Sequence, residues 1–137
     1  MEPISPKATS AATASPDGRF DVMEPACPTR QIVGRIGDKW TLLVLYALAG
    51  NRVRRYTELR AEVKGVSQKM LTQTLRALER DGLVHRHVHA TVPPRVDYSL
   101  TELGASLGTA IATIRTWAYD HVEEVESARD RYDDRGA

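Results

Sequence analysis

The chain has 137 residues, of which 42% are hydrophobic, and its net charge is +1. This length predicts one domain that is large enough to bury a core. A single cysteine excludes an internal disulfide and any Cys-rich zinc cluster. No apolar run approaches the roughly 20 residues of a membrane span, and the first residues lack the apolar middle of a signal peptide. We therefore expect a cytoplasmic protein that has no membrane partner.

The charged side chains are distributed unevenly along the chain. Residues 1–51 hold 5 basic and 5 acidic side chains, whereas residues 52–100 hold 10 basic and 5 acidic ones, a net charge of +5. Residues 101–137 hold 4 basic and 8 acidic side chains, a net charge of −4. This asymmetry indicates an anionic partner for the middle segment only.

The N-terminal part predicts a mobile tail followed by two helices. Residues 1–24 are rich in Ala, Ser, Thr and Pro, and few of their side chains are large and apolar. Pro28 suits the first turn of a helix that reaches Ile36. Asp38 caps a second helix, which Gly50 ends. Because this second helix is apolar on nearly all sides, we expect it to be the buried centre of the domain.

The next segment predicts a helix-turn-helix. Val53–Tyr56 is a short strand or extended link, and Thr57 is the expected cap of a third helix that ends at Gly65. Between Gly65 and Ser67 there is room only for a tight turn. A further helix, Ser67–Asp81, completes the arrangement.

The helix Ser67–Asp81 is strongly amphipathic. Its apolar face is formed by Met70, Leu71, Leu75 and Leu78. Its opposite face carries long donors and amides, the side chains that read base edges and hold phosphates, and comprises Lys69, Thr72, Gln73, Arg76 and Arg80. A surface helix with a solvated charged face would show the same pattern, but the preceding helix and turn favour a DNA-recognition helix.

After Gly82 the hydrophobic period changes from 3.6 to 2. Residues 83–89 and 95–100 are predicted strands, and Thr91–Pro94 is the turn between them. A β-hairpin directly after a recognition helix is a wing, from which Arg86 and Arg95 would touch phosphate or enter a minor groove.

Three alternating histidines, His85, His87 and His89, project from one face of the first wing strand. They raise the alternative of a metal site, because neutral imidazole is a good ligand. No carboxylate or cysteine follows at ligand spacing, so the solvated side of a strand is the favoured interpretation, and we expect no metal.

Thr101 is the expected cap of the last helix, whose apolar face continues to Val125. This helix is longer than a small winged domain needs, so we expect it to form a subunit interface, with packing onto its own domain as the alternative. The predicted fold class is α+β, mostly helical, a winged helix-turn-helix with N- and C-terminal dimerisation helices. Its parts are a disordered tail at 1–24, the domain at 25–125 and a flexible end at 126–137.

Cys27 is the most notable single residue. It lies at the start of a helix, where backbone N–H groups and the helix dipole stabilise a thiolate, and Arg30 lies one turn further on. Such a thiol is suited to oxidation or to a disulfide with a second copy. A small buried hydrophobe that fills space is the equally open alternative.

Several motifs resemble one known family. C-P-T-R-Q-I-V-G-R-I-G-D-K-W, Y-T-E-L-R, G-V-S-Q-K-M-L-T-Q-T-L-R-A-L-E-R-D-G-L-V and V-P-P-R-V-D-Y-S-L-T-E-L-G are similar to the HxlR-type winged-helix transcriptional regulators. The resemblance covers about Cys27 to Leu107 and implies a bacterial homodimer on a pseudo-palindromic operator. It places the helix from Ser67 in the major groove. Several family members sense electrophiles or oxidants through the cysteine before this proline, which favours a redox role for Cys27.

The expected function is therefore a dimeric DNA-binding regulator in the cytoplasm, associated with the nucleoid. Base contacts are expected from Gln68, Lys69, Thr72 and Gln73, and phosphate contacts from Ser67, Arg76, Arg54, Arg55, Arg86 and Arg95. Because the chain lacks a Gly-rich phosphate loop, a zinc-protease motif and a nucleophile elbow, we expect no enzyme, no catalytic residues and no cofactor. Two alternatives are a regulator controlled by a small-molecule effector, with Cys27 structural, and a protein-interaction module on the same scaffold.

Overall fold

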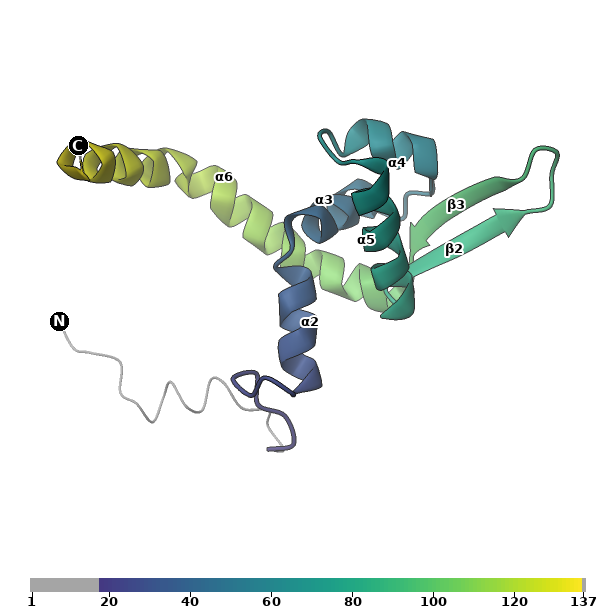
Figure 1. Ribbon diagram of the computed structural model, residues 1–137, viewed down its shortest axis with the longest axis horizontal. Helices are drawn as coiled ribbons and strands as arrows, with labels where there is room; N and C mark the ends of the chain where they lie inside the picture. Colours follow the sequence, from purple (N-terminus) through teal and green to yellow (C-terminus); the bar gives the residue numbers. More distant parts are fainter. Residues whose placement is uncertain (1–17, 137) are drawn as a thin grey trace. The chain divides into compact units, whose positions relative to one another are not determined.

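The computed structural model describes residues 18–136, which form five helices and one three-stranded sheet (Figure 1). The elements are α2 (Pro28–Ile36), α3 (Lys39–Leu48), β1 (Arg54–Arg55), α4 (Tyr56–Glu62), α5 (Gln68–Arg80), β2 (Val84–His89), β3 (Arg95–Leu100) and α6 (Glu102–Gly136). This order confirms the predicted α+β, mostly helical winged helix-turn-helix fold. The chain divides into two compact units, one up to Leu42 and one from Leu43 onward. None of the helices within residues 18–136 combines the length and apolar character that a membrane span requires.

The first unit contains α2 and the start of α3. Cys27 is the N-cap of α2 and Pro28 occupies its first turn, as predicted. No residue of α2 is buried, and the side chains of Ile32 and Val33 are 53% and 52% exposed. The Asp38 carboxylate accepts hydrogen bonds from the N–H group of Thr41 at 3.0 Å and from its hydroxyl at 3.3 Å. Asp38 therefore caps α3, as predicted.

The predicted tail, 1–24, lies mostly outside the described residues. Its last part forms hydrogen-bonded turns that lead into α2. The Glu24 N–H group donates to the Asp21 carbonyl oxygen at 3.0 Å, and the Cys27 N–H group donates to the Glu24 carbonyl oxygen at 3.0 Å.

The core of the second unit is aliphatic and is built around α3, as its apolar sequence predicts. The fully buried side chains of this unit come from α3, α4, α5 and α6 and are Val44, Leu45, Leu48, Leu59, Leu71, Leu75, Leu78 and Ile111. Because three leucines of α5 belong to this core, the opposite face of α5 is directed to solvent.

The sheet has the strand order β1-β3-β2 and is antiparallel throughout. Strands β2 and β3 pair from Val84 opposite Leu100 to His89 opposite Arg95. In the short strand β1, Arg54 lies opposite Tyr98. The β2–β3 hairpin projects from the helices as the predicted wing (Figure 1).

Helix α4 begins earlier than its sequence suggests, so the expected cap at Thr57 is wrong. The N-cap is Arg55, and the Glu58 carboxylate accepts a hydrogen bond from the Arg55 N–H group at 2.8 Å. A carboxylate three residues into a helix satisfies a free N–H group at the helix start. This bond places Tyr56 in the first turn of α4 directly after β1.

Helix α6 begins at a network centred on Thr101. The Thr101 hydroxyl donates to the Gly82 carbonyl oxygen at 2.6 Å and accepts a hydrogen bond from the Gly104 N–H group at 2.9 Å. The helix continues to Gly136, so residues 126–136, expected as a flexible end, are helical. Their Glu, Ala and Arg residues favour a helix. Only Gly104 and Ile111 of α6 are buried within the described chain.

Gly104 offers a direct test of this junction, because a Cβ atom on it would overlap the Leu83 carbonyl oxygen. We expect Gly104→Ala to lower the free energy of unfolding by about 1–3 kcal/mol, the usual cost of overpacking. Gly108→Ala is the matched control on the same helix, because nothing lies within 4 Å of its added Cβ atom. Alanine is the better helix former, so this control should be neutral or stabilising. Urea unfolding monitored by circular dichroism measures both, and equal stability of the two variants would contradict the packing described here.

Candidate nucleic-acid interface

The turn between α4 and α5 is fixed by Gly65 and Ser67, the two residues at which the sequence predicts it. Gly65 has a φ angle of +90°, a conformation that glycine adopts without steric cost. The Ser67 hydroxyl accepts a hydrogen bond from the Met70 N–H group at 3.1 Å and so caps α5 as predicted. At the other end, Gly82 has a φ angle of +75° and leads the chain into β2.

Helix α5 presents one apolar and one polar face. Leu71, Leu75 and Leu78 are buried, whereas the exposed side chains are Gln68, Lys69, Gln73, Arg76, Glu79 and Arg80. Thr72 is half-buried and lies at the edge of the polar face. The structure thus brings together on α5 the five side chains named as contacts within this helix, next to the capping Ser67.

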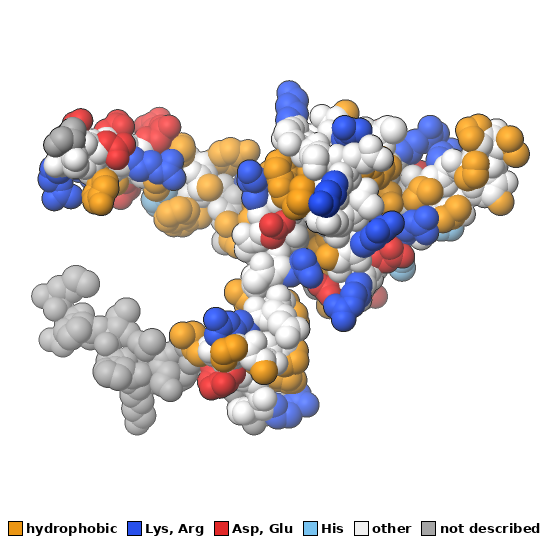
Figure 2. All heavy atoms as spheres, in the orientation of Figure 1, with side chains coloured by type: hydrophobic (Ala, Val, Ile, Leu, Met, Phe, Trp, Pro, Cys, Tyr) orange, Lys and Arg blue, Asp and Glu red, His pale blue; other side chains and the backbone are white. Residues whose placement is uncertain are grey.

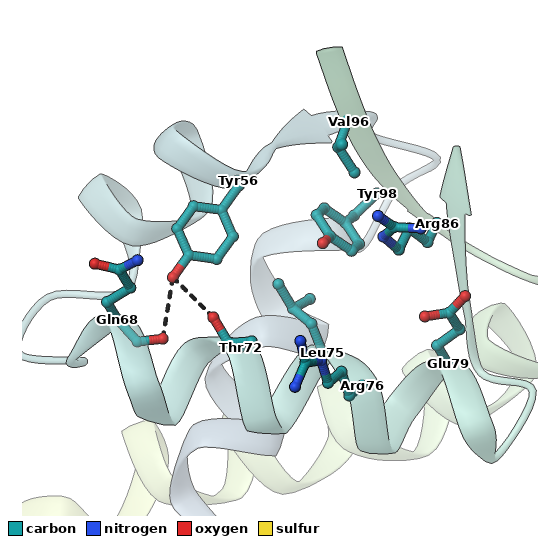
Figure 3. A pocket seen from close by; sticks show the side chains of 9 residues that line it. All are labelled: Tyr56, Gln68, Thr72, Leu75, Arg76, Glu79, Arg86, Val96 and Tyr98. Carbon is teal, nitrogen blue, oxygen red and sulfur yellow. Dashed lines mark hydrogen bonds between the residues drawn. The ribbon is translucent and has the colours of Figure 1, made fainter. Parts of the chain in front are cut away.

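Tyr56 holds the first turns of α5, a role that the local sequence pattern does not predict. Its hydroxyl donates to the Gln68 carbonyl oxygen at 3.0 Å and lies 3.2 Å from the Thr72 hydroxyl (Figure 3). The sequence predicts that Tyr56 belongs to an extended link. No local pattern indicates that its hydroxyl bonds to Gln68 and Thr72, which lie 12 and 16 residues further along the chain.

A cavity of about 470 Å³ separates α5 from the wing (Figure 3). Arg76 and Glu79 line it from α5, Arg86 and Tyr98 line it from the sheet, and Tyr56 and Thr72 close one end. Arg76 and Arg86, predicted from separate motifs, therefore share one hollow surface.

A second groove of about 580 Å³ lies between the wing turn and the start of α4. Arg55 and Arg95 line it together with Thr57, Thr91 and the Pro93–Pro94 pair. The pairing of β1 with β3 brings these two arginines together from positions 40 residues apart in sequence.

Two of the predicted phosphate contacts have acidic neighbours. The Arg54 guanidinium lies 3.4 Å from the Glu62 carboxylate, and Arg95 Nε lies 3.6 Å from Asp97 Oδ1. Asp97 Oδ2 also lies 2.6 Å from His89 Nε2. Strand pairing thus supplies a carboxylate beside the histidines that sequence spacing does not reveal. Residues 18–136 hold no group of histidine, cysteine and acidic side chains suited to a metal ion.

The charged side chains lie on the surface as the basic segment 52–100 and the acidic segment 101–137 predict. Lys and Arg side chains gather over α4, α5 and the wing, whereas Asp and Glu side chains gather at the C-terminal end of α6 (Figure 2). The basic segment 52–100 therefore coincides with the exposed face of α5 and with both hollows. Such a surface attracts a polyanion.

Cys27 lies in the first unit, and its side chain is 9% exposed. Burial acts to raise the pKa of the thiol, but hydrogen bonds outweigh it, so the pKa is lowered overall. These bonds come from the Thr29 side chain and backbone and from the backbone at Asp21 and Arg30. The Arg30 guanidinium itself donates to the Met23 carbonyl oxygen at 2.9 Å.

Helices α4 and α5 with their tight turn, followed by the β2–β3 wing, define a winged helix-turn-helix DNA-binding protein. A family model described as HxlR-like helix-turn-helix matches residues 35–126. The chain belongs to this family, which confirms the resemblance seen in its motifs.

Known relatives are transcriptional regulators. The chain is 39% identical over 104 residues to YtfH of Escherichia coli K12, described as an uncharacterised HTH-type transcriptional regulator, and the match spans 76% of this chain and 82% of YtfH. The solved ytfH regulator of Salmonella typhimurium is 35% identical with a TM-score of 0.75, over 81% of this chain and 98% of that one. These descriptions are of regulators and not of enzymes, as expected from the sequence.

A second similar protein of known structure is the redox regulator HypR. Its oxidised form is 38% identical with a TM-score of 0.63, over 69% of this chain and 96% of that one. Its reduced form is 37% identical with a TM-score of 0.67, over 73% of this chain and 98% of that one.

Proposed function

We propose that this protein is a homodimeric transcriptional regulator that binds a pseudo-palindromic DNA operator with α5 in the major groove. The observation that carries the proposal is the polar face of α5, flanked by the two arginine-lined hollows. Because the core fixes the opposite face of α5, these side chains are held in register along one surface. The regulator acts in the cytoplasm on nucleoid DNA.

The predicted contacts divide into two groups by their chemistry. Gln68, Lys69, Thr72 and Gln73 read base edges, because amides, ammonium groups and hydroxyls match the hydrogen-bonding groups of the major groove. Phosphates are bound without sequence preference by Ser67, Arg76, Arg54, Arg55, Arg86 and Arg95. The Glu62 carboxylate beside Arg54 and the Asp97 carboxylate beside Arg95 offset part of the attraction of these two arginines for phosphate.

The dimer is formed through α6. A helix of 35 residues is about 50 Å long, yet nothing in α6 beyond Ile111 is buried within the described chain. Ile114, Trp117 and Val122 are 50%, 57% and 47% exposed. Apolar side chains repeated along one helix are typical of a helix-pair interface. With the usual geometry, the two half-sites lie about 34 Å apart.

Cys27 is the proposed switch. Its lowered thiol pKa increases the thiolate fraction at neutral pH, and the thiolate is the reactive form. The likeness to HypR, described as a redox regulator and solved in oxidised and reduced forms, supports the same chemistry here. Oxidants or electrophiles are the effectors.

Two substitutions test the division of contacts. We expect Gln73→Ala to lose about 1–3 kcal/mol of discrimination at one base pair, because a lost base contact is local. We expect Arg95→Ala to weaken operator and scrambled DNA alike and to reduce the salt slope by about 1, because a phosphate contact releases counterions. Fluorescence anisotropy on both duplexes at several salt concentrations measures this.

The matched control for Arg95 is Arg129→Ala, an exposed arginine in the acidic end of α6. It should leave affinity and salt slope unchanged. Equal losses for the Gln73 and Arg95 variants on operator and scrambled DNA would contradict the assignment.

Trp117→Lys tests the dimer. We expect it to raise the dimer dissociation constant at least about 30-fold, the effect of losing a hot-spot aromatic. Trp117 is exposed in the single chain, so the helical circular dichroism of the subunit should be retained. Sedimentation velocity measures the association, and Glu124→Lys on the same helix is the control. A Trp117→Lys protein that dimerises like the wild type would exclude this face as the interface.

Oxidation tests the switch. Treatment with diamide should change operator affinity about 5- to 150-fold, the range of ordinary allosteric coupling, and Cys27→Ser should abolish the response. Gel shifts of treated and reduced protein measure the change.

Thr29→Val keeps the thiol but removes the side-chain hydrogen bond that helps to lower its pKa, so oxidation at neutral pH should slow. A response that persists in Cys27→Ser would instead favour control by a non-covalent small molecule.

A further inference from the structure

We propose that Tyr56 is a positioning residue that sets the hydrogen-bonding polarity of Thr72 and thereby selects the base read at that point of α5. This inference rests on the proposed function, because it requires α5 to lie in the major groove. It concerns the two hydrogen bonds that join the Tyr56 hydroxyl to the Gln68 carbonyl and to the Thr72 hydroxyl (Figure 3).

The direction of the two hydrogen bonds follows from counting protons. A backbone carbonyl only accepts, so the single proton of the Tyr56 hydroxyl is donated to the Gln68 oxygen at 3.0 Å. The phenol oxygen then faces the Thr72 hydroxyl at 3.2 Å with lone pairs only. The bond between these two hydroxyls therefore takes its proton from Thr72.

The positions of the Tyr56 and Thr72 hydroxyls are fixed by the elements that carry them. Tyr56 is the first residue of α4 and directly follows β1, which is paired with β3. Both Tyr56 and Thr72 are half-buried, and both line the cavity between α5 and the wing. A β-branched threonine in a helix also has few side-chain rotamers available. The Thr72 hydroxyl thus keeps one orientation before DNA binds.

The Thr72 hydroxyl can therefore act toward DNA only as a hydrogen-bond acceptor. Its proton is engaged by Tyr56, so the remaining lone pairs accept hydrogen bonds but the hydroxyl does not donate to DNA. In the major groove, adenine N6 and cytosine N4 are donors, whereas guanine O6 and thymine O4 are acceptors. Thr72 therefore favours adenine or cytosine at the base that it contacts and disfavours guanine or thymine.

The experiment begins with operators selected from random duplexes by wild-type protein. Affinities are then measured on the operator and on every single base-pair substitution of one half-site. Tyr56→Phe frees the Thr72 proton, so Thr72 both donates and accepts. We expect the preference for adenine or cytosine to fall roughly three- to tenfold at one base pair, as for one lost hydrogen bond, with other positions unchanged.

Three further variants sharpen the test. Thr72→Val should change the base preference at the same base pair. The double variant with Tyr56→Phe should show the same base preferences as Thr72→Val alone. Tyr46→Phe is the matched control, because the Tyr46 hydroxyl also donates to a carbonyl oxygen, that of Ile111 at 3.4 Å, away from α5. It should leave every base preference unchanged even if stability falls.

Three results would overturn the proposal. The first is a Tyr56→Phe protein that keeps all base preferences, and the second is one that binds all operator variants more weakly by one common factor, as a merely structural role predicts. Unchanged wild-type affinity when the adenine N6 or cytosine N4 amino group at the affected base pair is replaced by hydrogen would also contradict it. In each case wild-type binding to the operator would leave the proposed function standing, whereas wild-type protein that selects no DNA would overturn both.

Discussion

The relative positions of α5, the wing and α6 depend on one junction, at which α5 ends, the wing begins and α6 starts. The Leu83 N–H group donates to the Leu78 carbonyl of α5 at 2.9 Å, and the Leu83 carbonyl accepts from the Thr101 N–H group at 3.1 Å. Gly104 allows α6 to approach this same carbonyl, because it lacks a Cβ atom. Three elements are therefore fixed to one another by backbone groups, whose positions depend little on side-chain rotamers.

From this junction the two faces of α5 acquire different roles. The leucines that it buries hold the helix in the aliphatic core, and this packing leaves the amide and cationic side chains in solvent. The first turn of α5 lies far from the junction along the helix and is held separately by the Ser67 cap and the Tyr56 hydroxyl. A helix fixed at both ends presents its polar face with little freedom, and pre-organisation of this kind reduces the entropy lost on binding.

Local patterns in the sequence are sufficient to predict most of this architecture. The caps at Asp38, Ser67 and Thr101 and the amphipathic period of α5 each depend on residues within one or two turns, and the structure confirms them. The relations that were missed link distant residues. Asp97 meets His89 only through the register of the hairpin, and Tyr56 reaches Thr72 only once α4 and α5 are packed. Even the error at Thr57 has this origin, because β1 pairing and Glu58 together decide where α4 starts.

The same junction gives α6 its place in the proposed regulator. Because Thr101 joins the start of α6 to the backbone of Gly82 and Leu83 just after α5, α6 cannot turn at its base without breaking these hydrogen bonds. The Tyr46 hydroxyl at Ile111 and the Arg115 guanidinium over the Tyr46 ring hold the next turns to α3. If two copies pair along the exposed part of α6, the angle between those helices therefore sets the separation of the two α5 helices. A change at the dimer interface would then reach DNA as a change in half-site spacing, without any rearrangement inside the winged domain.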